Sequence, residues 1–433
     1  MEKYKLIHDT VHGSIRLDPL WIDIISTPEM NRLANIKQLG TAYIVFPGAH
    51  HSRFEHSLGT GYVAYRMARA LRLDDLEKRT VATAGLLHDL GHGPFSHVLE
   101  GILHKKTGKD HMDVTKEMIR GEYDPGAGVG SWGRIPEILE KYELDPKEVA
   151  ALVSEDSSPE RTLEIWFNQE EKRFQGEKRY MNQIIHGVVD ADQIDYLLRD
   201  SHYTGVAHGG IDFPRLLATL EKAGDELVVN LKGLTAVEGM LVARSLMYSS
   251  VYFHKTVRIS QQMLTKAVEK VEAPPLDVQS MVDGQLLEWL SKQGDFQKEM
   301  VQRLRFRSLY KTVYAKTPRN LNEKEKEFFA ELAEPKALKD MEEHIARRAG
   351  ISSGGVIIDI PLPALLLSEP RIDQTEINVT DGKSVRPLSA YSTISSAVQK
   401  RTVPMWSVVV SVVPEAREKA RAVVEAEFQP SSP

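Results

Sequence analysis

His88 and Asp89 stand side by side, directly after an apolar run. A neutral imidazole and a carboxylate are both suitable ligands for a hard or borderline divalent cation. Two ligands leave most of a coordination sphere empty, so other segments must supply the rest. His56 and Asp192 are the candidates, and the sequence therefore predicts a metal site made of two histidines and two aspartates.

Each of these residues could instead be a hydrogen-bonded core residue, and for a single histidine that is the better interpretation. The four together favour a metal, because a buried carboxylate or imidazole needs a partner and a helical bundle can gather inward-facing side chains around one cation. We interpret the pair His8-Asp9, which lies in an extended segment, as structural. Asp195 lies four residues before Arg199, and a helical ion pair explains it adequately.

The composition limits the classes of protein to consider. The chain has 433 residues, of which 42% are hydrophobic and 27% charged, as is usual for globular proteins. The absence of cysteine excludes disulfides, zinc-thiolate sites and cysteine nucleophiles. A net charge of -6 gives no general attraction to nucleic acid or an anionic membrane. Because the N-terminus is polar and no long apolar run follows, we expect a cytoplasmic protein without membrane spans.

The elements that must position these residues are mainly helices. We expect a hairpin over 4–18, a helical body over 1–330 and a small α+β lobe over 331–433. Predicted helices cover 27–40, 55–71, 76–90, a segment from 94 onward, 181–200, 237–270, 322–348 and 414–428, and predicted strands cover 356–360 and 406–413. Within 181–200, Asp192, Tyr196 and Asp200 follow i, i+4, i+8 spacing and share one face.

The sequence around these residues resembles that of the HD-domain metal-dependent phosphohydrolase superfamily. The segments SRFEHSLG at 52–59 and LHDLGHGPFSH at 87–97 are similar to deoxynucleoside triphosphate triphosphohydrolases, the branch related to the sterile-alpha-motif-and-HD-domain enzyme. The resemblance covers residues 4 to 270, and the C-terminal lobe weakly. It implies an HD-domain helical bundle in which a divalent metal ion activates water for attack on the α-phosphorus, releasing deoxynucleoside and triphosphate.

The resemblance also assigns roles to single residues. The implied metal ligands are His56, His88, Asp89 and Asp192, and the metal could be iron, manganese, zinc, nickel or magnesium. His97 is the candidate general acid, oriented by Glu100 one helical turn later, although the family usually has Asp at position 100. His92 and His111 would contact phosphate or support this proton relay, while a surface position at the start of a helix is the alternative for His111.

The resemblance implies a site for the triphosphate and the deoxyribose as well. Arg53, Arg244 and Lys255 match positions that contact the triphosphate, Gln38 and Asp200 match groups that hydrogen-bond a 3′-hydroxyl, Leu39 and Tyr252 match groups that crowd the 2′-carbon, and Tyr196 would stack on the sugar. Crowding at the 2′-carbon rejects an extra hydroxyl, so deoxynucleotides should be preferred over ribonucleotides.

Several positions depart from the family pattern. Gln193 replaces a lysine that contacts phosphate, and Tyr248 replaces a histidine. The guanine-nucleotide activator site of the relatives uses an acidic residue, a glutamine and an arginine, where this chain has Ser26, Asn31 and Ala34. We therefore predict either no activation by dGTP or a different effector mode.

Two other functions stay open at this point. The first is hydrolysis of another nucleotide phosphoester, such as a nucleoside monophosphate or a cyclic nucleotide. The second is binding of a nucleotide or nucleic acid with little catalysis, although no basic-aromatic stripe supports nucleic acid as a partner. The resemblance further implies a homo-oligomer, either a dimer or a tetramer.

Overall fold

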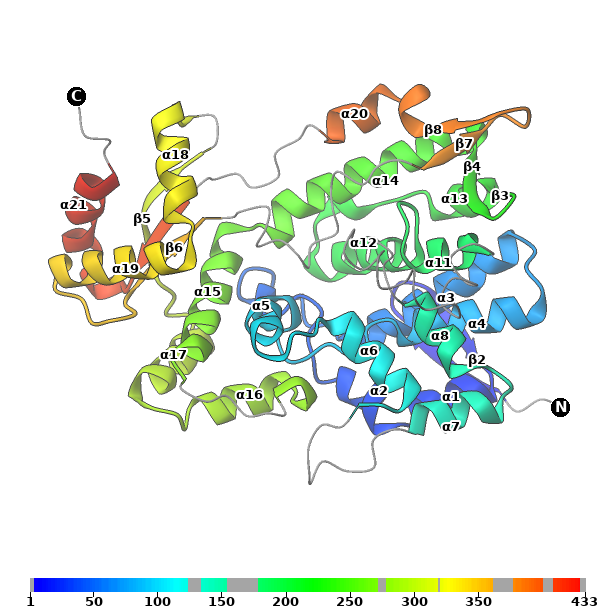
Figure 1. Cartoon of the computed structure of the whole chain (residues 1–433), viewed down its shortest axis with the longest axis horizontal. Coiled ribbons are helices and arrows are strands. Elements are labelled where there is room, and N and C mark those ends of the chain that lie inside the picture. Colours follow the sequence, from blue (N-terminus) through cyan, green and yellow to red (C-terminus); the bar gives the residue numbers. More distant parts are fainter. Residues whose placement is uncertain are drawn as a thin grey trace.

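The computed structural model describes residues 4–123, 134–153, 178–271, 278–317, 320–360, 377–399 and 408–428. Helices make up most of these residues, and three small sheets complete the fold (Figure 1). The predicted mainly α-helical class, with its N-terminal hairpin and C-terminal α+β lobe, is confirmed. Within the described residues, no helix is both long and apolar enough to cross a bilayer.

The helices of the body are α1 (Pro19–Ile25), α2 (Pro28–Leu33), α3 (Arg53–Ala70), α4 (Asp75–Leu87), α5 (Ser96–Thr107), α6 (His111–Arg120), α7 (Arg134–Lys141), α8 (Pro146–Leu152), α11 (Arg179–Ile185), α12 (Ala191–Thr204), α13 (Phe213–Thr219), α14 (Leu234–Met247), α15 (Lys255–Glu269), α16 (Asp283–Leu290) and α17 (Asp295–Arg305). The later helices are α18 (Glu323–Leu332), α19 (Pro335–Ala349), α20 (Thr393–Gln399) and α21 (Arg417–Phe428).

The strands form three separate sheets. The hairpin pairs β1 (Lys5–Asp9) with β2 (Gly13–Leu17), from Lys5 opposite Leu17 to Asp9 opposite Gly13. A four-stranded sheet has the order β3 (Leu220–Ala223), β4 (Glu226–Asn230), β7 (Asn378–Thr380) and β8 (Val385–Pro387), and a three-stranded antiparallel sheet has the order β5 (Lys311–Lys316), β9 (Val408–Val412) and β6 (Val356–Asp359).

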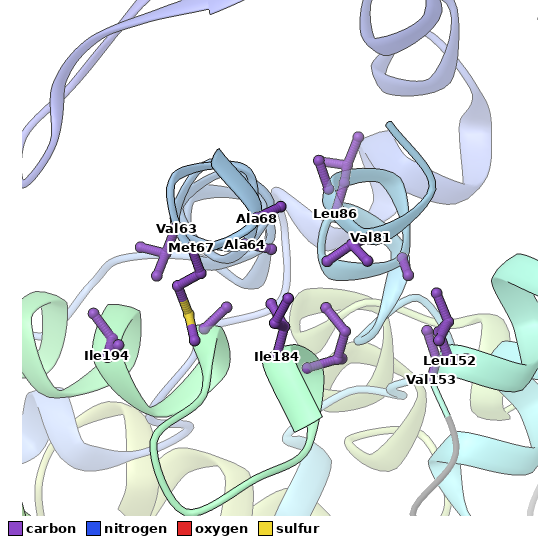
Figure 2. Close-up of a cluster of buried hydrophobic side chains, with 14 of the residues drawn as sticks. Val63, Ala64, Met67, Ala68, Val81, Leu86, Leu152, Val153, Ile184 and Ile194 are labelled. Carbon is purple, nitrogen blue, oxygen red and sulfur yellow. The ribbon is translucent and has the colours of Figure 1, made fainter. Parts of the chain in front are cut away.

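The pair α3 and α4 forms the centre of the body. Each helix starts with a capping box, Ser52 with Glu55 and Asp74 with Glu77, which satisfies backbone N–H groups of the first turn. Figure 2 shows Ala64 of α3 and Leu86 of α4 in a buried apolar cluster that extends to α11 and α12. Small side chains between the two helices allow close packing, and this packing holds the first turns of α3 near the end of α4.

The predicted helix over 181–200 is wrong, because the chain breaks between α11 and α12. Asp190 caps the new helix by accepting hydrogen bonds from the backbone N–H groups of Gln193 at 2.7 Å and Gly187 at 2.8 Å. Gly187 lies so close to the preceding turn that a Cβ atom there would be 2.5 Å from the carbonyl oxygen of Gln183. The break places Asp192 in the first turn of α12.

Three other predicted helices also end early or divide. The helix capped by Thr27 ends at Leu33, and the segment 322–348 divides where Pro335 starts α19. Between α14 and α15, a π-helical turn runs from Tyr248 to Tyr252. A π-helical turn contains an extra residue, which changes the directions of the side chains around it. The candidate residue Tyr252 is the last residue of this turn.

The C-terminal lobe consists of the sheet β5-β9-β6, and α18, α19 and α21 pack with it around a shared apolar core. β5 precedes residue 331. β7 follows it and pairs with β4 of the body, and β8 pairs with β7. Both sheets therefore join residues from the two sides of the predicted boundary at 330, and that boundary stays a prediction.

Gly59 in α3 offers a test of this packing. A Cβ atom at Gly59 would lie 1.9 Å from Oδ1 of Asp195 and 2.4 Å from Nη2 of Arg199, so α12 must shift to admit a methyl group. We expect Gly59→Ala to lower the free energy of unfolding by about 1–3 kcal/mol. Gly239→Ala in α14 meets no atom within 4 Å and should raise it by about 0.5–1 kcal/mol through helix propensity. Urea denaturation measures both, and equal effects would contradict the prediction.

Candidate metal centre

Three helices bring the four predicted metal ligands together. His56 lies in the first turn of α3, His88 caps the end of α4, Asp89 follows it, and Asp192 lies in the first turn of α12. One ligand atom from each of His56, His88 and Asp192 falls within 4.8 Å of the others. Nε2 of His56 lies 3.0 Å from Oδ1 of Asp192, and Nε2 of His88 lies 3.3 Å from Oδ1 of Asp89. The arrangement fits the predicted site, and the role of these residues as ligands stays a prediction.

The hydrogen bonding of His88 suits a metal ligand. Its Nδ1 lies 2.8 Å from the carbonyl oxygen of Gly85, so Nδ1 carries the proton and donates it. Its Nε2 is then the atom with a free lone pair, and it is buried with no hydrogen-bond partner among the described residues. A buried acceptor without a donor, aimed at two carboxylates, is what a divalent cation would satisfy.

The charges of the site point the same way. Although burial opposes the charged imidazole, hydrogen bonds with Asp192 and Asp195 raise the pKa of His56 to about 10. The carboxylates of Asp89 and Asp192 also raise the pKa of His88 against the effect of burial. The carboxylates that hold protons on these two rings would equally stabilise a divalent cation, which would take the place of the ring protons.

A second layer of side chains holds His56 in place. Oδ2 of Asp195 lies 2.8 Å from Nδ1 of His56, which leaves Nε2 of that ring facing Asp192. Asp195 also accepts from Arg199 at 2.9 and 3.0 Å, as the i, i+4 spacing predicted, and lies 2.7 Å from Nε2 of His12. Sequence reasoning missed His12, because its partner is 183 positions away.

Asp9 belongs to the same buried network. Its carboxylate accepts from the backbone N–H groups of Val11 and His12 in the hairpin turn and from Nη1 of Arg199 at 2.9 Å. The pair His8-Asp9 thus has the structural role expected for it. The hairpin is thereby tied to α12 through Arg199, a fully buried cation between two carboxylates.

The residues predicted to contact phosphate differ from one another in their burial and hydrogen bonds. Arg53 is buried beside the centre, where it donates to Asp89 and, through Nε, to Oγ of Ser96 at 2.6 Å. Arg244 is also buried and donates to Oε1 of Gln193 at 2.5 Å. Lys255 is exposed at the start of α15. Gln193, a departure from the pattern that the resemblance implies, thus pairs with Arg244.

His92, His111 and Glu100 form a connected group beside Asp89. Nε2 of His92 lies 3.3 Å from Oδ1 of Asp89, and the rings of His92 and His111 stack with centroids 3.9 Å apart. Burial, Arg53 and His111 hold the pKa of His92 well below its usual range. Burial opposes the charged form of His111 too, but Glu100 raises the pKa of His111.

Glu100 was expected to orient His97, and the structure pairs it with Nδ1 of His111. α6 begins at His111 and presents this ring to α5, which carries Glu100. The side chain of His97 lies outside the described part of the chain, so its role as general acid stays a prediction.

A cluster of polar groups lies further along α12, and we call it the Asp200 cluster: Gln38, His51, Tyr196, Asp200 and Tyr252. Asp200 accepts from the hydroxyl of Tyr252 at 2.6 Å and lies 2.7 Å from Nε2 of His51. Within the described residues, the hydroxyl of Tyr196 and Oε1 of Gln38 are buried without hydrogen-bond partners. Buried polar atoms of this kind need a partner, which an ordered water or a polar ligand would supply.

Leu39 and His51 come from the segment before α3. Leu39 is half-buried and packs against Ala42, Ala49 and Val257. Sequence reasoning missed His51, although it stands directly before the segment 52–59; its ring stacks on Tyr203, with centroids 4.6 Å apart. Its position beside that motif was the signal that could have found it.

A helical bundle that gathers histidine and aspartate side chains from three helices is suited to hold a metal ion. Comparison with known proteins gives the family: residues 53–200 match the HD domain and residues 211–430 match the HD associated region. The chain belongs to the HD-domain phosphohydrolase family, an enzyme family, and the resemblance noted in the sequence is confirmed.

Individual relatives agree with this assignment. The uncharacterized protein MJ1154 of Methanocaldococcus jannaschii is 32% identical over 412 residues, which cover 93% of this chain and 78% of that protein. The deoxynucleoside triphosphate triphosphohydrolase SAMHD1 of Homo sapiens is 32% identical over 298 residues, 63% of this chain and 45% of that protein. This chain thus spans less than half the length of that relative.

Solved structures show the same fold over nearly the whole chain. A hypothetical protein from Aquifex aeolicus has a TM-score of 0.70 at 28% identity, covering 98% of this chain and 100% of that one. A phosphohydrolase from Bacteroides thetaiotaomicron has a TM-score of 0.67 at 25% identity, covering 95% of this chain and 100% of that one.

Asp195→Asn tests the layer behind His56. The amide would turn a donor toward Arg199 or toward a histidine, so His56 would lose its fixed orientation. We expect metal affinity to fall by about 10- to 100-fold, as for other residues that orient a metal ligand. Competition with a fluorescent chelator measures this affinity. Asp340→Asn, at an exposed position of α19, is the control, and an unchanged affinity in folded Asp195→Asn would refute the role.

Proposed function

We propose that this protein hydrolyses deoxynucleoside triphosphates to deoxynucleoside and triphosphate. One observation carries the proposal: a single face of α12 bears Asp192 in the candidate metal centre and, at four-residue steps, Tyr196 and Asp200 in the Asp200 cluster. A group that binds sugar hydroxyls therefore lies next to a group suited to phosphate chemistry. The similarity to SAMHD1, whose name states this activity, supports the same substrate.

The residues of the site would have different roles in the reaction. A bound divalent cation would lower the pKa of a coordinated water and neutralise charge on the phosphoryl oxygens. Arg53 and Arg244 add positive charge on the phosphate side, which a chain of net charge -6 must provide locally. His97 would give a proton to the departing 5′-oxygen, while the pair of His111 and Glu100 would hold charge next to the neutral ring of His92.

The Asp200 cluster would select the sugar. Asp200 can accept a hydrogen bond from a 3′-hydroxyl, and burial holds the pKa of Tyr196 well above its usual range, so its hydroxyl stays a donor. Tyr252, fixed by its bond to Asp200, and Leu39 would leave no room beside the 2′-carbon. A ribonucleotide would place its extra hydroxyl against these groups.

A second candidate function is hydrolysis of another nucleotide phosphoester. Gln193 is neutral and accepts the hydrogen bond of Arg244, and Lys255 is exposed, so fewer cations face a triphosphate than the family pattern implies. A nucleoside monophosphate or cyclic nucleotide carries less charge and needs fewer cations. Chromatography of the products decides, because triphosphate is released only in the first case.

His88→Ala and Asp89→Ala test the catalytic centre. Loss of either group should lower turnover of dNTPs by a factor on the order of 10³ or more, since metal activation contributes several kcal/mol to catalysis. Turnover is measured by release of triphosphate from the metal-loaded protein. His344→Ala in the C-terminal lobe is the control, because His344 contacts Glu427 far along the chain from this centre. Unchanged activity in the folded variants would refute the proposed function.

The positions of the relatives' activator site predict the response to dGTP. Oγ of Ser26 donates to the carbonyl of Ile22, and Nδ2 of Asn31 donates to the carbonyls of Ile25 and Thr27. These side chains bond their own backbone and, with Ala34, offer neither a carboxylate nor a guanidinium for guanine. We expect dGTP to leave the hydrolysis rate of another dNTP unchanged, and a several-fold increase would contradict this.

A dimer or tetramer of this chain also remains a prediction.

A further inference from the structure

Asp283, the first residue of α16, joins two segments that are far apart in the sequence. Its Oδ1 accepts a hydrogen bond from the backbone N–H of Phe95 at 2.8 Å, and its Oδ2 accepts one from the backbone N–H of Lys37 at 3.0 Å. The residue is 5% exposed, so water does not replace these partners. Each carboxylate oxygen thus holds one segment.

Both segments lead directly into the candidate site. Lys37 precedes Gln38 and Leu39, which stand on the sugar side. Phe95 precedes Ser96, whose hydroxyl accepts from Arg53 on the phosphate side. The backbone of Phe95 has a φ of 49°, in the left-handed region that non-glycine residues avoid. The bond from Asp283 helps hold this strained backbone.

Neighbouring side chains hold the same segments. Arg32 donates through Nη2 to the carbonyl of Leu90 at 2.8 Å and through Nη1 to the carbonyl of Gln279 at 3.0 Å. The side-chain amide of Gln279 donates to the carbonyl of Gly91. Among the described residues, these bonds hold the chain at Leu90 and Gly91, while Asp283 binds both Lys37 and Phe95.

We propose that Asp283 is a positioning residue that couples the sugar side of the site to its phosphate side. Asp283 lies in the HD associated region and not in the HD-domain match at 53–200. A residue from outside the HD domain thus helps to position the site. The mechanical coupling stands on the hydrogen bonds alone. Its effect on substrate selection rests on the proposed function.

The carboxylate is needed because both backbone groups are donors. An asparagine has the same shape but only one acceptor oxygen, so its NH₂ group would face one of the two N–H groups. A buried donor facing a donor is unsatisfied and costs more than a lost bond. Asp283→Asn therefore breaks one connection with the least change in volume. Asp283→Ala removes both acceptor oxygens without adding a donor.

The test combines hydrogen exchange with kinetics on the full-length, metal-loaded protein. In Asp283→Ala, peptides covering 36–41 and 90–96 should both exchange faster by about tenfold, as expected for loss of a buried hydrogen bond, and in Asp283→Asn the segment that loses its acceptor should do so. The ratio of kcat/KM for dATP over ATP should fall, with kcat for dATP reduced and metal content unchanged. Glu342→Gln is the matched control, since this buried carboxylate accepts from Ile358 and Lys266 in and beside the C-terminal lobe.

The outcomes separate the inference from the proposed function. Faster exchange in both segments together with the lower dATP preference supports the inference. Unchanged exchange in Asp283→Ala, a change in only one of the two segments of that variant, the same change in Glu342→Gln, or altered exchange with unaltered kinetics each overturns it. A wild-type protein that releases no triphosphate from any dNTP overturns the proposed function instead, and hydrogen exchange then still decides the coupling.

Discussion

The structure depends on the pairing of buried charges where α12 crosses α3. Asp195 and Arg199 are fully buried, and burying ions without partners would cost several kcal/mol for each ion. Their bonds to one another, to His56 and to Asp9 satisfy them, and Gly59 provides the room. The same contacts set the orientation of His56, so the stability of the bundle and the geometry of the candidate centre share one network.

Helix ends and interruptions position most of the chemistry. His88 lies where α4 ends, Asp192 lies just after the break before α12, and Tyr252 ends the π-helical turn between α14 and α15. A side chain at a helix end or break can point toward a neighbouring element. Inside a regular helix, the helical repeat fixes the direction of each side chain. The interruptions are therefore part of the site.

Segments outside the HD-domain match complete the site. Tyr252 and Arg244 come from the α14 region, and Tyr248 and Phe253 of the same turn pack against Val409 of β9. Arg258 of α15 pairs with Asp359 of β6 at 2.7 Å. The C-terminal lobe is thus in contact with the helix junction that carries Tyr252.

The sequence by itself determined what local patterns encode. Thr27 as a helix cap, the hairpin near Gly13, the ion pair Asp195-Arg199 and the shared face of Asp192, Tyr196 and Asp200 all follow from short-range spacing. The motif segments also indicated His56, His88 and Asp89, and the fold brings them together with Asp192.

Only the tertiary structure decided which groups meet across long stretches of chain. The contacts of His12 with Asp195, of His51 with Asp200 and of Asp283 with Lys37 and Phe95 join residues more than a hundred positions apart, and no local spacing encodes them. The bond between Glu100 and His111 had the same origin, because α6 had to fold back on α5. Helix breaks near Asp190 and Tyr248 likewise depended on capping and packing, which outweighed a continuous helical pattern.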